Sequence, residues 1–151
     1  MAKTSRYPKV APDAPLRALS DAVLRTLWEE ICSQASGALA GDVDPVHDMR
    51  VAIRRFRSAL RSFRRCYRGE TRRPVAKGMR RLGRVMGSVR DADVHLGVLR
   101  PALQAAVSTE AAGVEFVIER VSEERGRALA EAQRAFASLH PAAVRRMLDD
   151  A

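Results

Sequence analysis

The chain has 151 residues, a hydrophobic fraction of 46% and a formal net charge of +9, from 27 Lys and Arg against 18 Asp and Glu. A chain of this length and apolar content can bury a core of its own, which excludes a disordered basic polypeptide. No apolar run is long enough to predict a membrane span, and the first 15 residues lack the apolar core of a secretory signal. We therefore expect a soluble cytoplasmic protein, with a flexible N-terminal tail over 1–15 and one domain over 16–151.

Apolar residues recur at helical spacing along the whole domain, and no segment shows the alternation of a β-strand. The first amphipathic helix is predicted from Leu16 to the glycines of 37–41. Asp44 and Pro45 are a favourable N-cap and first helical residue, and they begin a second helix that is expected to end near Arg68. Further helices are predicted over 72–89, 91–106 with a kink or break at Pro101, 108–138, and from 141 onward. The sequence thus predicts an all-α antiparallel bundle of about five to six helices, similar to a four-helix bundle.

The second predicted helix carries an apolar stripe and a basic stripe side by side. The apolar residues advance by alternate steps of three and four positions: Val46, Met49, Ile53, Phe56, Leu60, Phe63 and Tyr67. The basic stripe advances by the same steps one position later: His47, Arg50, Arg54, Arg57, Arg61, Arg64 and Arg68. Arg55 and Arg65 lie beside this stripe and widen it. The apolar stripe predicts a face buried against the bundle and leaves the basic stripe on the surface.

The next predicted helix repeats this pattern over a shorter distance. Lys77, Arg80, Arg81 and Arg84 recur at the helical spacings i, i+3, i+4 and i+7. If the two helices are antiparallel neighbours, their basic faces can line one groove. Arg90 follows these residues directly after the predicted end of the same helix.

The positive charge is confined to the middle of the chain. Residues 50–90 contain 15 Lys and Arg and a single acid, a net charge of +14, whereas the remaining 12 basic and 17 acidic residues give −5. A solvated helix face ordinarily mixes both signs, because opposite charges four residues apart attract and like charges repel. The segment 46–68 contains eight arginines and no lysine, which favours bidentate binding of phosphate oxygens. We infer a polyanionic ligand, with a merely solvated basic face as the alternative.

The kind of polyanion is less strongly determined. Proteins that bind single-stranded nucleic acid expose aromatic side chains for base stacking, whereas Phe56, Phe63 and Tyr67 lie on the apolar stripe. No helix-turn-helix turn or zinc-ligand spacing is present. A phosphate chain without bases is therefore the first candidate, and a nucleic-acid backbone the second.

A phosphate-transfer enzyme, or an accessory module of one, is the third candidate, and the sequence gives catalytic chemistry little support. There is no P-loop, nucleophile elbow or carboxylate cluster beside the basic stripe, so no catalytic residue and no cofactor are predicted. Asp91 and Asp93 could hold Mg²⁺, but carboxylates beside Arg90 more often cap a helix or orient arginines. We expect no metal site.

Two motifs resemble those of a known family, the CHAD domains, or conserved-histidine α-helical domains. The first is H-x-x-R-V-x-x-R-R-x-R-x-x-x-R-x-F, which begins at His47 and ends at Phe63. The second is similar to L-G-x-x-R-D-x-D-V and lies in "LGRVMGSVRDADVHLGVL", which begins at Leu82. The two motifs follow in the family's order, about 35 residues apart.

The resemblance implies two four-helix bundles related by a pseudo-twofold axis, and binding of inorganic polyphosphate along a basic surface. It carries over a principal set of ligand residues: His47, Arg50, Arg54, Arg55 and Arg57. The residues that flank this set are Arg61, Arg64, Lys77, Arg80, Arg81, Arg84 and Arg90. The second basic helix of the family has no counterpart after Arg120, so the chain resembles half of the domain. We expect a homodimer to supply the other half, with a short or truncated member of the family as the alternative. We also expect an association with polyphosphate granules.

Overall fold

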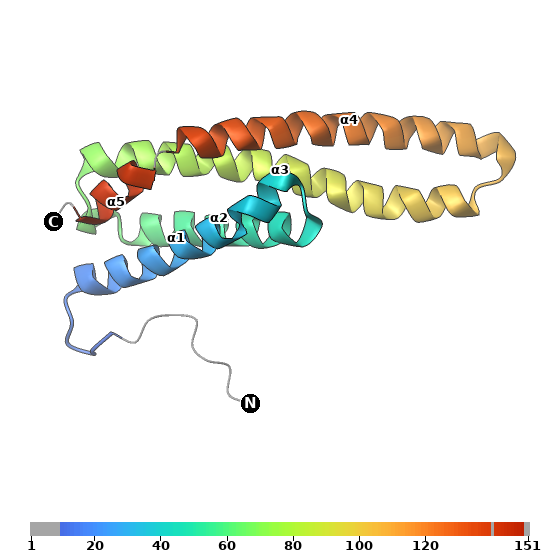
Figure 1. The fold of residues 1–151 in the computed structure, drawn as a ribbon. Coiled ribbons are helices and arrows are strands. Elements are labelled where there is room, and N and C mark those ends of the chain that lie inside the picture. The colour runs from blue at the N-terminus through green and yellow to red at the C-terminus, as the bar shows by residue number, and fades with distance from the viewer. Residues whose placement is uncertain (1–9, 140, 150–151) are drawn as a thin grey trace.

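The computed structural model describes residues 10–139 and 141–149. Within these ranges the chain forms no strand and has five α-helices: α1 (Leu16–Ala40), α2 (Val43–Ser62), α3 (Gly69–Ala105), α4 (Ser108–Ser138) and α5 (Pro141–Asp149). A short 3-10 helix, η1 (Arg64–Cys66), lies between α2 and α3. Figure 1 shows α3 and α4 as a long antiparallel hairpin, with α2 beside the part of α3 nearer to its start and α1 beside α2. The predicted all-α antiparallel bundle is confirmed.

Most predicted helix positions are confirmed, but the limits of α2 are not. This helix begins at Val43, where the Val46 N–H donates to the Asp42 carbonyl at 3.0 Å, and it ends at Ser62 rather than near Arg68. Phe63 closes it, with its N–H bonded to the Ala59 carbonyl at 2.9 Å, and η1 follows. The basic residues after 63 therefore leave the helical stripe and lie in the connection to α3.

The helices predicted over 72–89 and 91–106 are one continuous helix, α3. Its buried positions run through the predicted break, because Val89, Ala92 and Leu96 all face the interior. Pro74 and Pro101 each remove one helical donor without ending the helix. The carbonyls that lose this donor belong to residues 70 and 97, which are exposed, so water can bind them instead.

The apolar stripe of α2 forms the centre of the core, as predicted. Five of its residues are at most 3% exposed, and they pack with the apolar faces of α1, α3 and α5: Val46, Met49, Ile53, Phe56 and Leu60. Phe63 is only partly buried at the end of the helix, and Tyr67 is buried beyond that end. Of the predicted tail over 1–15, residues 10–15 are non-helical and the others lie outside the described residues.

The tight connection between α1 and α2 depends on two glycines. Gly41 has φ +96°, and it ends α1 with its N–H bonded to the Gly37 and Ala38 carbonyls. Gly37 lets the helices approach closely, since a Cβ placed there would lie 2.8 Å from Pro45 Cγ. The close approach holds α2 against α1.

We expect Gly37→Ala to destabilise the fold, because a rigid proline ring cannot move away from the added methyl group. The cost is about 1–3 kcal/mol of overpacking, against a gain of up to about 1 kcal/mol in helix propensity. Gly97→Ala is the matched control, because a Cβ at Gly97 in α3 meets nothing within 4 Å. Chemical denaturation should show Gly37→Ala less stable and Gly97→Ala slightly more stable than wild type; equal shifts would contradict the close contact.

A polar network joins the start of α1 to the α2–α3 connection and to α5. Arg17 donates to the carboxylate of Asp21 at 2.9 Å and to the carbonyls of Cys66 at 2.6 Å and Leu148 at 2.9 Å. Its guanidinium lies 4.4 Å from the centre of the Tyr67 ring. The Tyr67 hydroxyl in turn bonds Ser20 at 2.6 Å and Asp21 at 2.7 Å. One arginine therefore fixes three segments that are distant in sequence.

We expect this network to weaken in strong alkali. Burial, and to a smaller extent the carboxylate of Asp21, raises the pKa of Tyr67 above its ordinary value of 10.0. Because the folded state holds this proton more tightly than the unfolded chain, the stabilisation is complete below about pH 10 and is lost above it. Unfolding measured from pH 8 to 11 should show a steeper loss of stability in wild type than in Tyr67→Phe. Parallel profiles would contradict the prediction.

Candidate functional site

Arginines from α2 and α3 converge in a small cavity between these helices. Its volume is about 120 Å³, and its lining contains no acidic residue: Arg57, Leu60, Arg61, Arg64, Arg72, Ala76 and Arg80. We call this cavity the arginine crevice. The guanidinium groups come from two antiparallel helices and from the connection between them, so the fold concentrates charge that the sequence spreads over 24 positions.

A close contact between α2 and α3 shapes the neighbouring surface. A Cβ placed at Gly83 would lie 3.1 Å from Ile53 Cγ2 and 3.2 Å from Arg57 Nη1. The absence of a side chain at Gly83 therefore lets Arg57 lie across α3. Next to the crevice, Arg57, Arg80, Gly83 and Arg84 line an open hollow of about 440 Å³.

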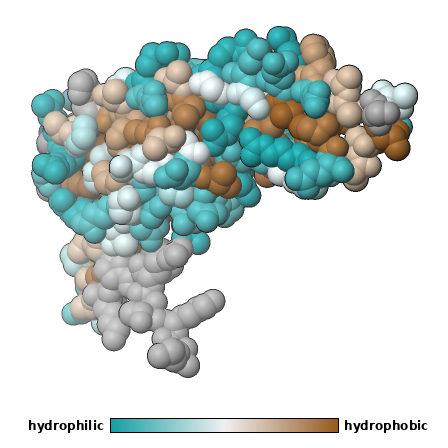
Figure 2. All heavy atoms as spheres, turned by 45° about the vertical axis from the view of Figure 1, so that its right-hand side comes forward, coloured by the Kyte–Doolittle hydropathy of each residue, from teal (hydrophilic) through white to brown (hydrophobic). Residues whose placement is uncertain are grey.

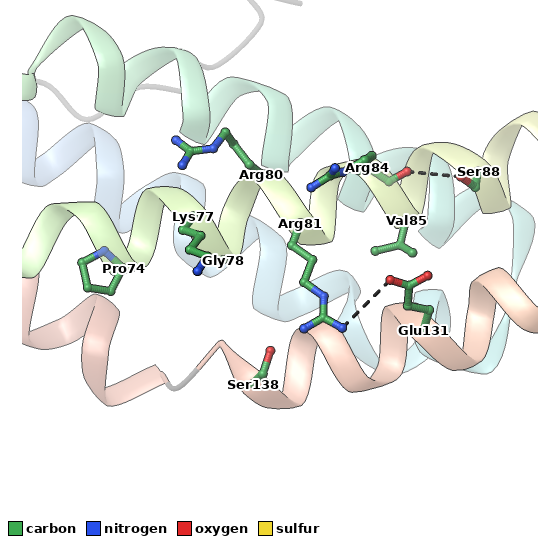
Figure 3. A pocket seen from close by; sticks show the side chains of 10 residues that line it. All are labelled: Pro74, Lys77, Gly78, Arg80, Arg81, Arg84, Val85, Ser88, Glu131 and Ser138. Atoms are coloured by element: carbon green, nitrogen blue, oxygen red, sulfur yellow. Dashed lines mark hydrogen bonds and ion pairs between the residues drawn. The ribbon is translucent and has the colours of Figure 1, made fainter.

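A second and wider groove follows the other side of α3. It has a volume of about 720 Å³, and its lining contains Lys77, Arg80, Arg81 and Arg84 of α3 together with Glu131 and Ser138 of α4. In Figure 3, Arg81 points towards α4, where its guanidinium lies 4.0 Å from the Glu131 carboxylate, and Arg80 points towards the opposite side of α3. We call this the α3–α4 groove. Arg80 lines both cavities, so one basic surface runs over α3 from the crevice to the groove.

The structure divides the predicted ligand residues into two sets. Seven of them line the crevice, the hollow or the groove: Arg57, Arg61, Arg64, Lys77, Arg80, Arg81 and Arg84. The other five line none of these cavities: His47, Arg50, Arg54, Arg55 and Arg90.

Arg55 lies on a different side of α2 from the crevice. It faces α1, with its guanidinium 4.0 Å from the carboxylate of Glu30. His47 and Arg54 are exposed on α2, and Arg50 and Arg90 are partly buried. Arg55 therefore contacts α1 and does not widen the basic surface at the crevice.

Arg72 is a site residue that the sequence reasoning did not include. It lines the arginine crevice, and its Nε atom is buried without a hydrogen-bond partner among the described residues. The spacing of Arg72, Ala76 and Arg80 at i, i+4 and i+8 places them on one face of a helix and could have identified it.

Asp93 has a structural role in the described part of the chain. Its Oδ1 accepts from Arg125 Nε at 2.6 Å, and the same guanidinium donates to the Gly41 carbonyl at 2.6 Å, which joins α3, α4 and the end of α1. The expectation that a carboxylate here orients an arginine agrees with this contact, and the arginine is Arg125. Among residues 10–139 and 141–149, no three metal-binding side chains form a group that could hold an ion.

No described helix combines the length and apolarity needed to cross a bilayer. No curated protein and no solved structure shows a significant match to the chain. The model of one protein family, described as the CHAD domain, matches residues 22–151, which include α2, α3, the crevice and the groove. The chain therefore belongs to the CHAD domain family.

Proposed function

We propose that this protein binds inorganic polyphosphate through the arginine crevice, the hollow and the α3–α4 groove, and that it does not cleave its ligand. The observation that carries the proposal is the crevice, where five arginines line one cavity with no acid among them. Their mutual repulsion is relieved when an anion occupies the space between them. CHAD membership is compatible with polyphosphate as that anion.

A phosphate chain matches the chemistry of this surface. Guanidinium groups bind phosphate oxygens through paired hydrogen bonds, and such charge-assisted bonds are about twice as strong as neutral ones. Because the ligand is a polyanion that releases counterions on binding, affinity should fall steeply as salt rises.

A nucleic-acid backbone is the second candidate, and the positions of the aromatic residues disfavour it. Phe56 is fully buried and Tyr67 is 6% exposed, so neither can stack on a base. Phe116 is 62% exposed, but it lies on α4 outside the cavities that contain the basic residues. A phosphate chain has no bases to stack, so the lack of exposed aromatic side chains beside these cavities does not weaken its binding.

The test is competition at moderate salt and equal phosphate concentration. Long-chain polyphosphate labelled with a fluorophore should bind, and neither duplex nor single-stranded DNA should displace it. Displacement by DNA would favour the second candidate. Release of orthophosphate after Mg²⁺ is added would show that the protein is an enzyme and would overturn the non-catalytic part of the proposal.

We also propose that two copies associate through the far end of the α3–α4 hairpin. None of residues 109–131 of α4 is buried, and three apolar side chains near the turn are more than 60% exposed: Val98, Val107 and Phe116. Figure 2 shows hydrophobic surface at the end of the molecule where α3 turns into α4. A second copy would cover this surface and supply the second bundle that the family resemblance implies.

We expect light scattering to give the mass of a dimer for wild type. The double variant Val98→Ser/Phe116→Ser should give a monomer, because it removes apolar area from the contact. Polyphosphate binding to each copy's crevice should remain. A monomeric mass for wild type at high protein concentration would overturn the proposed dimer.

The proposed ligand also suggests where in the cell this protein is located. We propose that the protein is cytoplasmic and accompanies polyphosphate granules, and its exposed free thiol at Cys32 fits a reducing compartment. A fluorescent fusion should colocalise with a polyphosphate stain. Colocalisation should disappear in cells that make no polyphosphate.

A further inference from the structure

We propose that the arginine crevice binds the terminal phosphate group of a polyphosphate chain, so that the chain is held by its end. This inference rests on the proposed function. It assigns different tasks to the three cavities: the crevice binds the end, and the hollow and the α3–α4 groove bind the phosphates that follow. Arg72 is the residue that makes the crevice selective for an end.

The first argument is size. The crevice has a volume of about 120 Å³, against about 720 Å³ for the groove. In liquid water about four molecules would occupy 120 Å³, so the crevice matches the size of a phosphate group rather than that of a long stretch of chain. The groove is large enough for a chain lying along it. Arg80 lines both cavities, so a chain that begins in the crevice can continue over α3.

The second argument is charge. A terminal phosphate has a second ionisation near pH 6 and carries about −1.5 to −2 at pH 7, whereas each internal phosphate carries one negative charge. The crevice collects guanidinium groups with no acid in its lining, whereas Glu131 contributes a carboxylate to the groove. The more highly charged group gains most where positive charge is densest and least neutralised.

The third argument is an unused donor. Arg72 Nε is buried and has no hydrogen-bond partner in the described part of the chain. Buried polar groups are almost always hydrogen-bonded, so an unpaired one beside a cavity is a donor that a ligand or a water molecule can satisfy. A terminal phosphate offers three oxygens that are not bridging and can accept from it. An internal phosphate offers only two.

The experiment compares polyphosphates of defined length at equal concentration of chains. If the crevice binds ends, affinity per chain rises until a chain fills the groove and is constant for longer chains. If binding is along the side of the chain, affinity per chain keeps rising with length, because longer chains offer more binding positions. Continued rise would overturn the inference while leaving the proposed function intact; no binding at any length would overturn both.

A second arm blocks the ends. Converting the terminal groups to phosphoramidates removes one negative charge and one oxygen from each end and leaves the internal phosphates unchanged. We expect capped chains to bind wild type at least tenfold more weakly than uncapped chains. Equal affinity would overturn the inference.

Two variants assign the effect to the crevice. Arg72→Gln should weaken the binding of uncapped chains and bring the ratio of uncapped to capped affinity close to one. Arg81→Gln is the matched control, because it removes one guanidinium from the groove outside the crevice; it should weaken both ligands and keep the ratio. Should Arg72→Gln prove unfolded by circular dichroism, Arg64→Gln at the same crevice replaces it. An unchanged ratio in a folded crevice variant would count against the proposal.

Discussion

Reversing two charges in the arginine crevice, with Arg57→Glu/Arg61→Glu, is expected to weaken polyphosphate binding at least about 100-fold. Each lost charge-assisted contact is worth about 1.5–3 kcal/mol, and each new carboxylate repels the ligand in addition. Both residues line the crevice, and Arg57 also lines the adjoining hollow. Fluorescence anisotropy with labelled polyphosphate measures the change at fixed salt.

The matched control changes the net charge by the same amount at a distance. Arg127 and Arg134 are exposed on α4 and line none of the cavities that contain the basic surface. Arg127→Glu/Arg134→Glu should weaken binding only a few-fold, through the long-range field, which salt screens. Circular dichroism should show unchanged helicity in both double variants. Equal losses would mean that net charge alone attracts the ligand and that the crevice has no special part.

The core of α2 could be predicted from the sequence because its signal is periodic. Alternate steps of three and four positions identify the buried face from Val46 to Leu60, and the structure confirms it. The same rule extended the helix too far. Phe63 and Tyr67 fit the spacing but contact the core from beyond the helix end, where spacing no longer reports orientation. Periodicity shows which residues are apolar neighbours and does not show where the backbone turns.

The basic surface could be predicted only as a set of residues. Charge counting located it on α2 and α3, but the crevice depends on which arginines of one helix meet those of the other. That register depends on Gly83, which lets Ile53 and Arg57 approach α3, and no feature of either stripe encodes it. The position of Arg72 in the crevice and the contact of Arg55 with Glu30 are also decided by tertiary contacts, which the spacing of residues in the sequence does not reveal.

Removing Arg125 is expected to cause a large loss of stability. Its guanidinium bonds the Asp93 carboxylate and the Gly41 carbonyl, both at 2.6 Å, and the Asp93 side chain is only 3% exposed. In Arg125→Met that carboxylate stays buried with no positive partner, since its other oxygen is also without a hydrogen bond among the described residues. Breaking a buried pair in this way costs about 3–5 kcal/mol. Urea unfolding at pH 7 measures the loss.

An exposed pair on the same helix provides the control. Arg120 lies 3.2 Å from Glu123, and both side chains are more than half exposed, so Arg120→Met should cost less than about 1 kcal/mol. The double variant Arg125→Met/Asp93→Leu should recover part of the loss, because it removes the stranded charge together with its partner. If Arg125→Met cost no more than Arg120→Met, the contact of α4 with Asp93 and with the end of α1 would not hold the hairpin to the bundle. If the double variant were less stable than Arg125→Met alone, Asp93 would have a stabilising partner other than Arg125.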